Sequence, residues 1–196
     1  MSVDMLIALS VFCLVSSITP GPNNLMLLSS GINFGIRRSL GHLFGVALGF
    51  NVMVVLVGVG VSQVFELYPD SYIVLKYLSI CYLSYLAYKI ANSGSITNDS
   101  ARQKPISFIQ AVLFQWVNPK AWTMALSVNA VYASDQTLTA VLLVSAVFLL
   151  CNFPAITLWL VAGQGLKQFL SQPQKLKVFN ILMAGLLVSS FIPMLD

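Results

Sequence analysis

The feature that most constrains this 196-residue chain is a set of long apolar stretches without charge. Met5 to Ile36 and Gln136 to Leu166 contain no Lys, Arg, Asp or Glu, and neither does Ser39 to Phe65. Only 8% of all residues are charged, whereas a soluble domain has about 25%. So few charges cannot cover a surface that faces water. The sequence therefore predicts that most of the chain faces lipid.

A helix that spans a bilayer needs about 20 predominantly apolar residues, and stretches of this length recur along the chain. The short alternating segments of a transmembrane β-barrel do not match these stretches. We therefore predict an all-α polytopic membrane protein that forms a single transmembrane domain over 1–196. Six transmembrane helices are expected near 5–30, 39–62, 71–91, 106–132, 137–160 and 178–195.

Basic residues alternate between the predicted connections. Eight of them fall in every second connection, namely Arg37, Arg38, Lys89, Arg102, Lys104, Lys167, Lys175 and Lys177. The opposite side contains five acids and one lysine, namely Asp4, Glu66, Asp70, Asp135, Asp196 and Lys76. Lysine and arginine concentrate in cytoplasmic loops. This asymmetry predicts a multi-pass membrane protein with its three basic connections in the cytoplasm and both termini outside.

Two predicted helices contain helix-breaking residues near their middle. The first break consists of Pro20, Gly21, Pro22, Asn23 and Asn24, and the second consists of Asn118, Pro119 and Lys120. The breaks are half the chain length apart, and each half, 1–97 and 98–196, contains three predicted spans. Two such halves have opposite orientations. This pattern predicts a 3+3 inverted repeat, in which discontinuous helices mark the substrate site.

The chemistry of such breaks favours a zwitterion. Proline lacks an N–H, so Pro20, Pro22 and Pro119 would free the carbonyls of Ser16, Ile18 and Gln115. A new helix then begins after each break, and its N-terminal N–H groups suit a carboxylate. The freed carbonyls and the asparagine side chains suit an ammonium group. The alternative is a pair of proline kinks retained for packing, as we expect for Pro154.

Lys120 is predicted about 13 residues from either end of its helix, and a cation at this depth is a candidate functional group. A lysine that reaches a water-filled vestibule is the alternative. Lys76 lies near the predicted outer surface, where snorkelling explains it. His42 follows the first basic connection, where a structural role is favoured. Trp116 and Trp122 flank the second break and would either line a cavity or fill space.

Other patterns indicate packing or exclude whole classes of function. Gly41, Gly45 and Gly49 form a small-residue ridge that permits close helix approach. Cys13, Cys81 and Cys151 are isolated, so neither a metal site nor a disulfide is expected. No enzyme motif or ATP-binding motif is present, so we expect no enzymatic activity and no cofactor. Basic residues do not cluster with aromatic residues, which argues against nucleic acid as a partner.

Several motifs occur here in the order found in the LysE/RhtB family of bacterial amino-acid exporters, which the chain resembles along almost its whole length. They are Thr19–Asn24, the basic loop Gly35–Arg38, the glycine ridge, Tyr82–Leu86 and Val117–Ala121. The resemblance implies export of small amino acids or their derivatives, powered by an ion gradient, by a protein of the cytoplasmic (inner) membrane. Many members carry Asp where this chain has Asn152, and the branch that exports cysteine and O-acetylserine shares the Asn. The resemblance therefore places Asn152 in the site and argues against a carboxylate mechanism there.

The function expected from the sequence is secondary transport that exports a small neutral amino acid or derivative, of the cysteine, O-acetylserine, homoserine or threonine type. Lys120 and the helix N-termini would bind the carboxylate, and Asn23, Asn24 and freed carbonyls would bind the ammonium group. The expected partners are this substrate and membrane lipid. Three spans per half also suggest a homodimer, although no motif supports one. A passive small-solute channel and a non-transporting membrane subunit are the alternatives.

Overall fold

The computed structural model describes residues 1–61, 63, 67, 68, 70–93, 104–134, 137–170 and 172–189. Within these residues every regular element is helical. The elements are α1 (Val3–Ile18), α2 (Pro22–Leu56), the π-helix η1 (Val57–Val61), α4 (Asp70–Ala91), α5 (Phe108–Val117), α6 (Pro119–Tyr132), α7 (Leu138–Leu166) and α8 (Pro173–Ser189). The all-helical prediction is therefore confirmed for the part of the chain that the structure describes.

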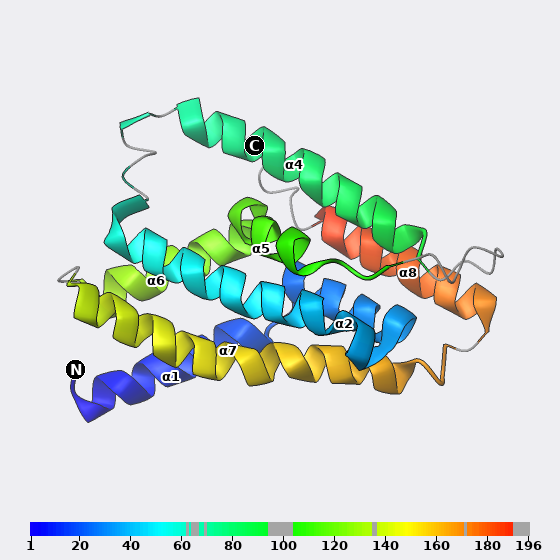
Figure 1. The fold of residues 1–196 in the computed structure, drawn as a ribbon, viewed down its shortest axis with the longest axis horizontal. Coiled ribbons are helices and arrows are strands. Elements are labelled where there is room, and N and C mark those ends of the chain that lie inside the picture. Colours follow the sequence, from blue (N-terminus) through cyan, green and yellow to red (C-terminus); the bar gives the residue numbers. More distant parts are fainter. Residues whose placement is uncertain are drawn as a thin grey trace.

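α4 and α7 run roughly along the long axis of the molecule between two opposite poles, whereas α1 ends and α6 begins near its middle (Figure 1). α2 and α7 form the centre and share the most extensive packing. α1 packs against α7, α5 packs against α2, and α4 pairs with α8 along one side (Figure 1). α4, with Lys89 in its last turn, and α7, which Lys167 follows, both end at the right-hand pole of Figure 1, whereas α1 and α4 begin at the left-hand pole.

α2 reverses its direction at Gly35, the one residue inside it with non-helical dihedral angles (φ 76°, ψ 171°). A positive φ costs glycine little, whereas it is strained for other residues. Ser30 and His42 form a 2.9 Å hydrogen bond across the reversal, and Ser39 Oγ donates to Ser30 O at 3.2 Å. The two arms of α2, 22–34 and 36–56, therefore lie side by side and antiparallel.

This reversal corrects the boundaries expected from the sequence, which ended one helix at 30 and began the next at 39. Helix continues to the residue before Gly35 and resumes directly after it, so Arg37 and Arg38 are helical. The side chain of Gln164 in α7 stabilises the turn by accepting a 2.7 Å hydrogen bond from the Ile36 N–H. A loop is unnecessary because glycine makes the turn and a distant side chain satisfies one of the new orphan N–H groups.

Three helices in the described residues are long and apolar enough to cross a membrane, namely Pro22–Val61, Ile73–Ala91 and Leu138–Leu166. Val3–Ile18 and Phe108–Val117 are also apolar but have only 16 and 10 residues, respectively. Both end at the breaks predicted from the sequence. A span needs about 20 residues, so a helix that stops midway falls short of this length by itself.

Small residues allow the closest helix contacts. A Cβ atom on Gly49 would lie 2.8 Å from Val112 Cα in α5, and one on Gly45 would lie 2.7 Å from Ala111 Cβ. The predicted close approach along this ridge is therefore confirmed for Gly45 and Gly49. A second close contact, between Gly31 in α2 and Gly163 in α7, was not expected from the sequence. It holds the first arm of α2 directly against the central helix.

We expect Gly163→Ala to destabilise the protein by about 1–3 kcal/mol, as overpacking typically does. The new methyl group would collide with the backbone carbonyl oxygen of Leu28, which cannot move like the end of a flexible side chain. Gly165→Ala, in the same helix, is the matched control because a Cβ there meets nothing within 4 Å. Thermal unfolding in detergent measures both variants. Equal melting temperatures would contradict the close contact.

Candidate functional site

The two predicted helix breaks are present in the structure. α1 ends at Ile18 and α2 begins at Pro22, with Gly21 in an extended conformation between them (φ −174°, ψ 175°). α5 ends at Val117 and α6 begins at Pro119, with Asn118 extended between them (φ −93°, ψ 108°). Both prolines are the first residue of the new helix, where the missing N–H breaks no intrahelical bond. The sequence therefore stops one helix and starts the next at each break.

The carbonyls that the prolines free are bound by the protein itself. Ser16 O accepts a hydrogen bond from Thr19 Oγ1 at 2.9 Å. Ile18 O accepts one from the Trp159 indole N–H of α7 at 3.1 Å. Gln115 O accepts the Asn118 N–H at 3.3 Å. These bonds satisfy the requirement that backbone polar groups in a membrane find partners within the protein.

Asn24, near the beginning of α2, also donates hydrogen bonds to backbone carbonyls of the first break. Its side-chain amide donates to Ser17 O and to Thr19 O, both at 2.8 Å, and the residue is buried. The N-terminus of α2 itself has no side-chain cap. Its first N–H groups and their positive dipole end are therefore available to an anion.

Lys120 joins the second break to the first. Its Nζ donates to Thr19 O at 2.8 Å, to Thr19 Oγ1 at 2.9 Å and, at 3.4 Å, to Pro20 O. These three acceptors use the full donor capacity of the ammonium group. They also lie at the C-terminal end of α1, where a helix dipole favours a cation. Gly21 leaves room for this contact, since a Cβ there would lie 2.7 Å from Lys120 Cδ.

A second link between the breaks comes from Asn23 and Gln115, which exchange hydrogen bonds in both directions. Asn23 Nδ2 donates to Gln115 Oε1 at 2.8 Å, and Gln115 Nε2 donates to Asn23 Oδ1 at 3.1 Å. Gln115 is fully buried and also donates to Ala111 O within α5. The sequence analysis missed Gln115. Its signal was an amide in a mostly apolar helix, three residues before the second break.

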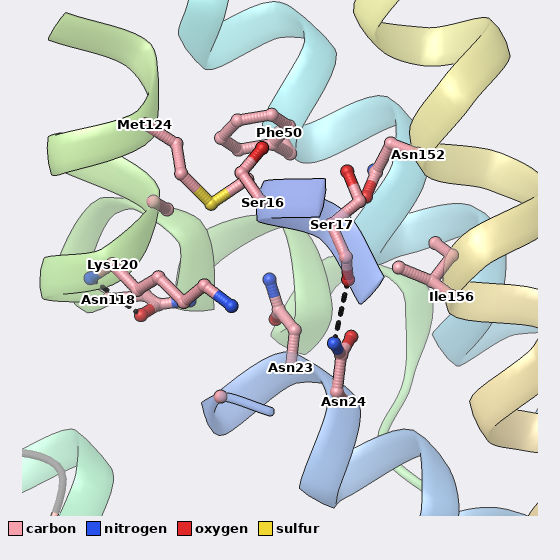
Figure 2. Close-up of a pocket in the computed structure, with 12 residues that line it drawn as sticks. Ser16, Ser17, Asn23, Asn24, Phe50, Asn118, Lys120, Met124, Asn152 and Ile156 are labelled. Atoms are coloured by element: carbon pink, nitrogen blue, oxygen red, sulfur yellow. Dashed lines mark hydrogen bonds between the residues drawn. The ribbon is translucent and has the colours of Figure 1, made fainter. Parts of the chain in front are cut away.

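A small cavity lies where the breaks meet (Figure 2). Side chains from α1, α2, α6 and α7 converge on it, and Lys120 points toward Asn23. Its free volume of about 20 Å³ has room for about one water molecule. The lining residues are Ser16, Ser17, Gly21, Asn23, Asn24, Phe50, Asn118, Lys120, Ala121, Met124, Asn152 and Ile156.

The structure brings together six of the nine residues that the sequence analysis placed in the site. Those six line the cavity, and they are Gly21, Asn23, Asn24, Asn118, Lys120 and Asn152. The other three are prolines beside it. Pro20 offers its carbonyl to Lys120, whereas Pro22 and Pro119 start the two new helices. Among the described residues, the cavity lining contains one cation and no carboxylate.

Ser17 is the most informative lining residue that the sequence analysis did not select. It is 3% exposed, and its hydroxyl has no hydrogen-bond partner among the described residues. A buried hydroxyl without a partner is rare in proteins and often marks a place where a water molecule or ligand binds. Serine is common in membrane helices, so the sequence alone gave no reason to select it.

Trp116, Trp122 and His42, which the sequence analysis also considered, make packing and hydrogen-bond contacts away from the cavity lining. Trp122 Nε1 donates to Trp116 O at 2.8 Å, and the two rings pack edge to face with centroids 5.9 Å apart. They fill space beside the second break and do not line the cavity. His42 is fully buried and hydrogen-bonds to Ser30. In the described part of the chain, no three His, Cys, Asp or Glu side chains are grouped so that they could bind a metal ion.

Comparison with known proteins identifies the family of the chain. The profile of the LysE type translocators matches residues 14–191. Cysteine/O-acetylserine efflux proteins from Escherichia coli strain K12 and from Shigella sonnei strain Ss046 are each 31% identical to this chain over 191 residues. The alignment covers 96% of this chain and 96% of each relative. No solved structure matches the chain. The match over almost its full length shows that the chain is a multi-pass membrane protein and belongs to the LysE type translocator family.

Proposed function

We propose that the protein is a secondary transporter that exports small neutral amino acids or their derivatives across the cytoplasmic membrane, and that the joined helix breaks form its substrate site. The observation that carries this proposal is the meeting of Lys120 with the carbonyl oxygens of the first break. A cation that can bind a carboxylate lies there beside carbonyl oxygens that can bind an ammonium group, and an amino acid carries both of these groups. The efflux relatives support cysteine and O-acetylserine as the first substrates to test.

Binding at this site is an exchange of partners. The cavity has room for about one water molecule, whereas even alanine has six non-hydrogen atoms. A substrate therefore enters only when Lys120 separates from Thr19 and Pro20. The substrate carboxylate then binds the Lys120 ammonium group and the uncapped N-terminus of α2. The substrate ammonium group replaces Lys120 at the carbonyls of Thr19 and Pro20, so that no charged group loses its partner.

The same exchange gives a route to alternating access. α1 and the first arm of α2 belong to the first half of the chain, whereas α5 and α6 belong to the second half. The contacts of Lys120 with Thr19 and of Asn23 with Gln115 join these halves across the cavity. A substrate that breaks the first contact loosens one half against the other. We infer that the structure represents an occluded conformation between the inward-open and outward-open states.

The proposed topology has six spans, arranged as a 3+3 inverted repeat with halves 1–97 and 98–196 in a single domain. Each half begins with a broken span, formed by α1 with the first arm of α2 or by α5 with α6. The packing is reciprocal, since α1 contacts α7 while α5 contacts the second arm of α2. α4 and α8, the last span of each half, also pair with each other. Such reciprocity is expected of two halves related by a pseudo-two-fold axis.

We further propose that both termini face away from the cytoplasm. The turn of α2 with Arg37 and Arg38, the end of α4 with Lys89, the end of α7 before Lys167 and the start of α8 with Lys175 and Lys177 lie toward one pole. This pole faces the cytoplasm under the positive-inside rule. Four residues used in the charge argument lie outside the described residues, namely Glu66, Arg102, Asp135 and Asp196.

Cysteine labelling tests this orientation. In a variant whose native cysteines are replaced, Tyr68→Cys is expected to react with a membrane-impermeant maleimide in intact cells. Lys104→Cys is expected to react only after the membrane is permeabilised. Both side chains are exposed, so a difference in their reaction with the maleimide reports the side of the membrane on which each lies. Reaction of Lys104→Cys in intact cells would contradict the proposed orientation.

Counterflow in proteoliposomes tests the function. Vesicles loaded with unlabelled O-acetylserine, cysteine, serine, threonine or homoserine are diluted into a trace of the same labelled compound. A transporter accumulates label transiently, and protein-free vesicles are the control. A passive channel equilibrates the label without this transient and conducts in single-channel recordings. No flux of any of these compounds would favour a non-transporting membrane subunit and overturn the proposal.

A further inference from the structure

A second cavity lies at the basic pole of the molecule and shares no lining residue with the cavity at the helix breaks. It has a volume of about 300 Å³, which is at the lower limit for small-molecule pockets. Lys89 and Lys104 line it together with the aromatic side chains of Phe34, Tyr85 and Tyr88. These residues come from the end of the first arm of α2, from the last turns of α4 and from the segment before α5.

The charged side chains that the structure describes around this cavity have one sign. Lys89 is half-buried and gives one hydrogen bond to Gln110 Oε1, at a long 3.3 Å, which leaves two of its three donors for another acceptor. Arg38 lies over the Phe34 ring, 5.5 Å from its centroid, and adds a third cation beside the cavity wall. The acids that the structure describes, Asp4 and Asp70, begin α1 and α4 at the opposite pole. An anion is therefore the complementary ligand.

An exposed apolar face of α4 leads directly to this cavity. Val74, Leu78, Cys81, Tyr85 and Tyr88 recur every three or four residues, so they share one side of the helix, and all of them are exposed. In a membrane this side faces the acyl chains. The tyrosines at its end are typical of the level of the lipid headgroups. A ligand that combines an anionic head with a hydrocarbon tail fits both features at once.

We propose that this cavity binds the headgroup of an anionic phospholipid. The phosphodiester accepts hydrogen bonds from Lys89 and Lys104, and an acyl chain lies along the exposed face of α4. Basic pockets between helices at the cytoplasmic surface are suited to such headgroups. The lipid contacts elements from both halves of the chain, because Lys89 belongs to the first half and Lys104 to the second. This inference does not depend on the identity of the transported substrate.

Native mass spectrometry of the purified protein in a neutral detergent tests the proposal by titration with phosphatidylglycerol. The variant is Lys89→Gln with Lys104→Gln. The matched control, Lys167→Gln with Lys177→Gln, removes two lysines near the same pole from outside the cavity. We expect the cavity variant to bind phosphatidylglycerol about thirtyfold more weakly than wild type, and the control to stay within about threefold. Phosphatidylcholine is expected to bind equally weakly to all three proteins.

Three results would overturn the proposal. An unchanged affinity of the cavity variant would mean that the lipid does not bind there. An equal loss in the control would indicate only diffuse attraction by net charge. Displacement of the lipid by millimolar inorganic phosphate would identify a free phosphate as the ligand. If the double variant fails to fold because Gln110 loses its partner, Lys104→Gln alone is expected to weaken binding about fivefold and keeps the test decisive.

Discussion

Lys120→Gln is expected to weaken substrate binding about tenfold to a hundredfold, because a charged hydrogen bond to the substrate carboxylate is typically worth about 1.5–3 kcal/mol. The ammonium group is the only cation among the described residues that line the cavity. Glutamine has a similar length and still offers an N–H donor to Thr19 O. Equilibrium binding of a labelled amino acid to purified protein, or half-saturation in counterflow, measures the loss.

Lys76→Gln is the control for this variant. It removes a lysine from another transmembrane helix, α4, in which Lys76 lies near the end opposite to the basic pole. Its substrate affinity is expected to equal that of wild type. Thermal unfolding separates binding from folding, because Lys120 also satisfies the carbonyls at the end of α1. Near-wild-type affinity in Lys120→Gln, in a folded protein, would show that the second break is structural and that the site lies elsewhere.

Lysine and arginine are expected to compete for transport at least about a hundredfold more weakly than neutral amino acids, since a buried charge without a partner costs several kcal/mol. The cavity lining has no carboxylate among the described residues, and Asn152 offers only a neutral amide. The side-chain cation of either amino acid would therefore be desolvated beside Lys120 without compensation. Competition in counterflow of labelled serine measures the difference. Equal competition by lysine and serine would contradict the proposed site.

Asn152→Asp provides a complementary test of the same argument. A carboxylate on α7 would offer the missing partner to a second cation, so the variant is expected to narrow the gap between lysine and serine. The same variant adds a negative charge near the substrate carboxylate and should weaken neutral substrates. An unchanged ratio of the two competitors would mean that Asn152, although it lines the cavity, does not face the side chain of the substrate.

The helices and their breaks were predictable because they depend on local chemistry. Apolar stretches of about 20 residues indicate spans, and Pro22 and Pro119 each begin a new helix for reasons that hold in any fold. The positions of both breaks were therefore correct. A reversal between the first two spans was expected, but as a connection of several residues. Its actual form was missed because Gly35 makes the turn alone, and the side chain that stabilises it, Gln164, lies 128 residues away.

The contacts between residues of the site were harder to predict from the sequence. Lys120 was selected for its depth in the membrane, but its contact with Thr19 joins residues 101 positions apart. Gln115 and Ser17 stand out only when burial is known, since each is an ordinary polar residue in an apolar helix. The contact between Gly31 and Gly163 is likewise a property of two packed helices, which a single sequence does not reveal.

The central claim is that a transported amino acid occupies the space between the two helix breaks. Substrate protection of Ser16→Cys tests it directly in a protein without Cys13, Cys81 and Cys151. Ser16 lines the cavity, whereas Ser10, two turns earlier on α1, does not and serves as the control position. We predict that serine or O-acetylserine slows alkylation of Ser16→Cys at the concentration that half-saturates transport, and leaves Ser10→Cys unchanged. Undiminished alkylation of a transport-competent Ser16→Cys variant at saturating substrate would contradict the claim.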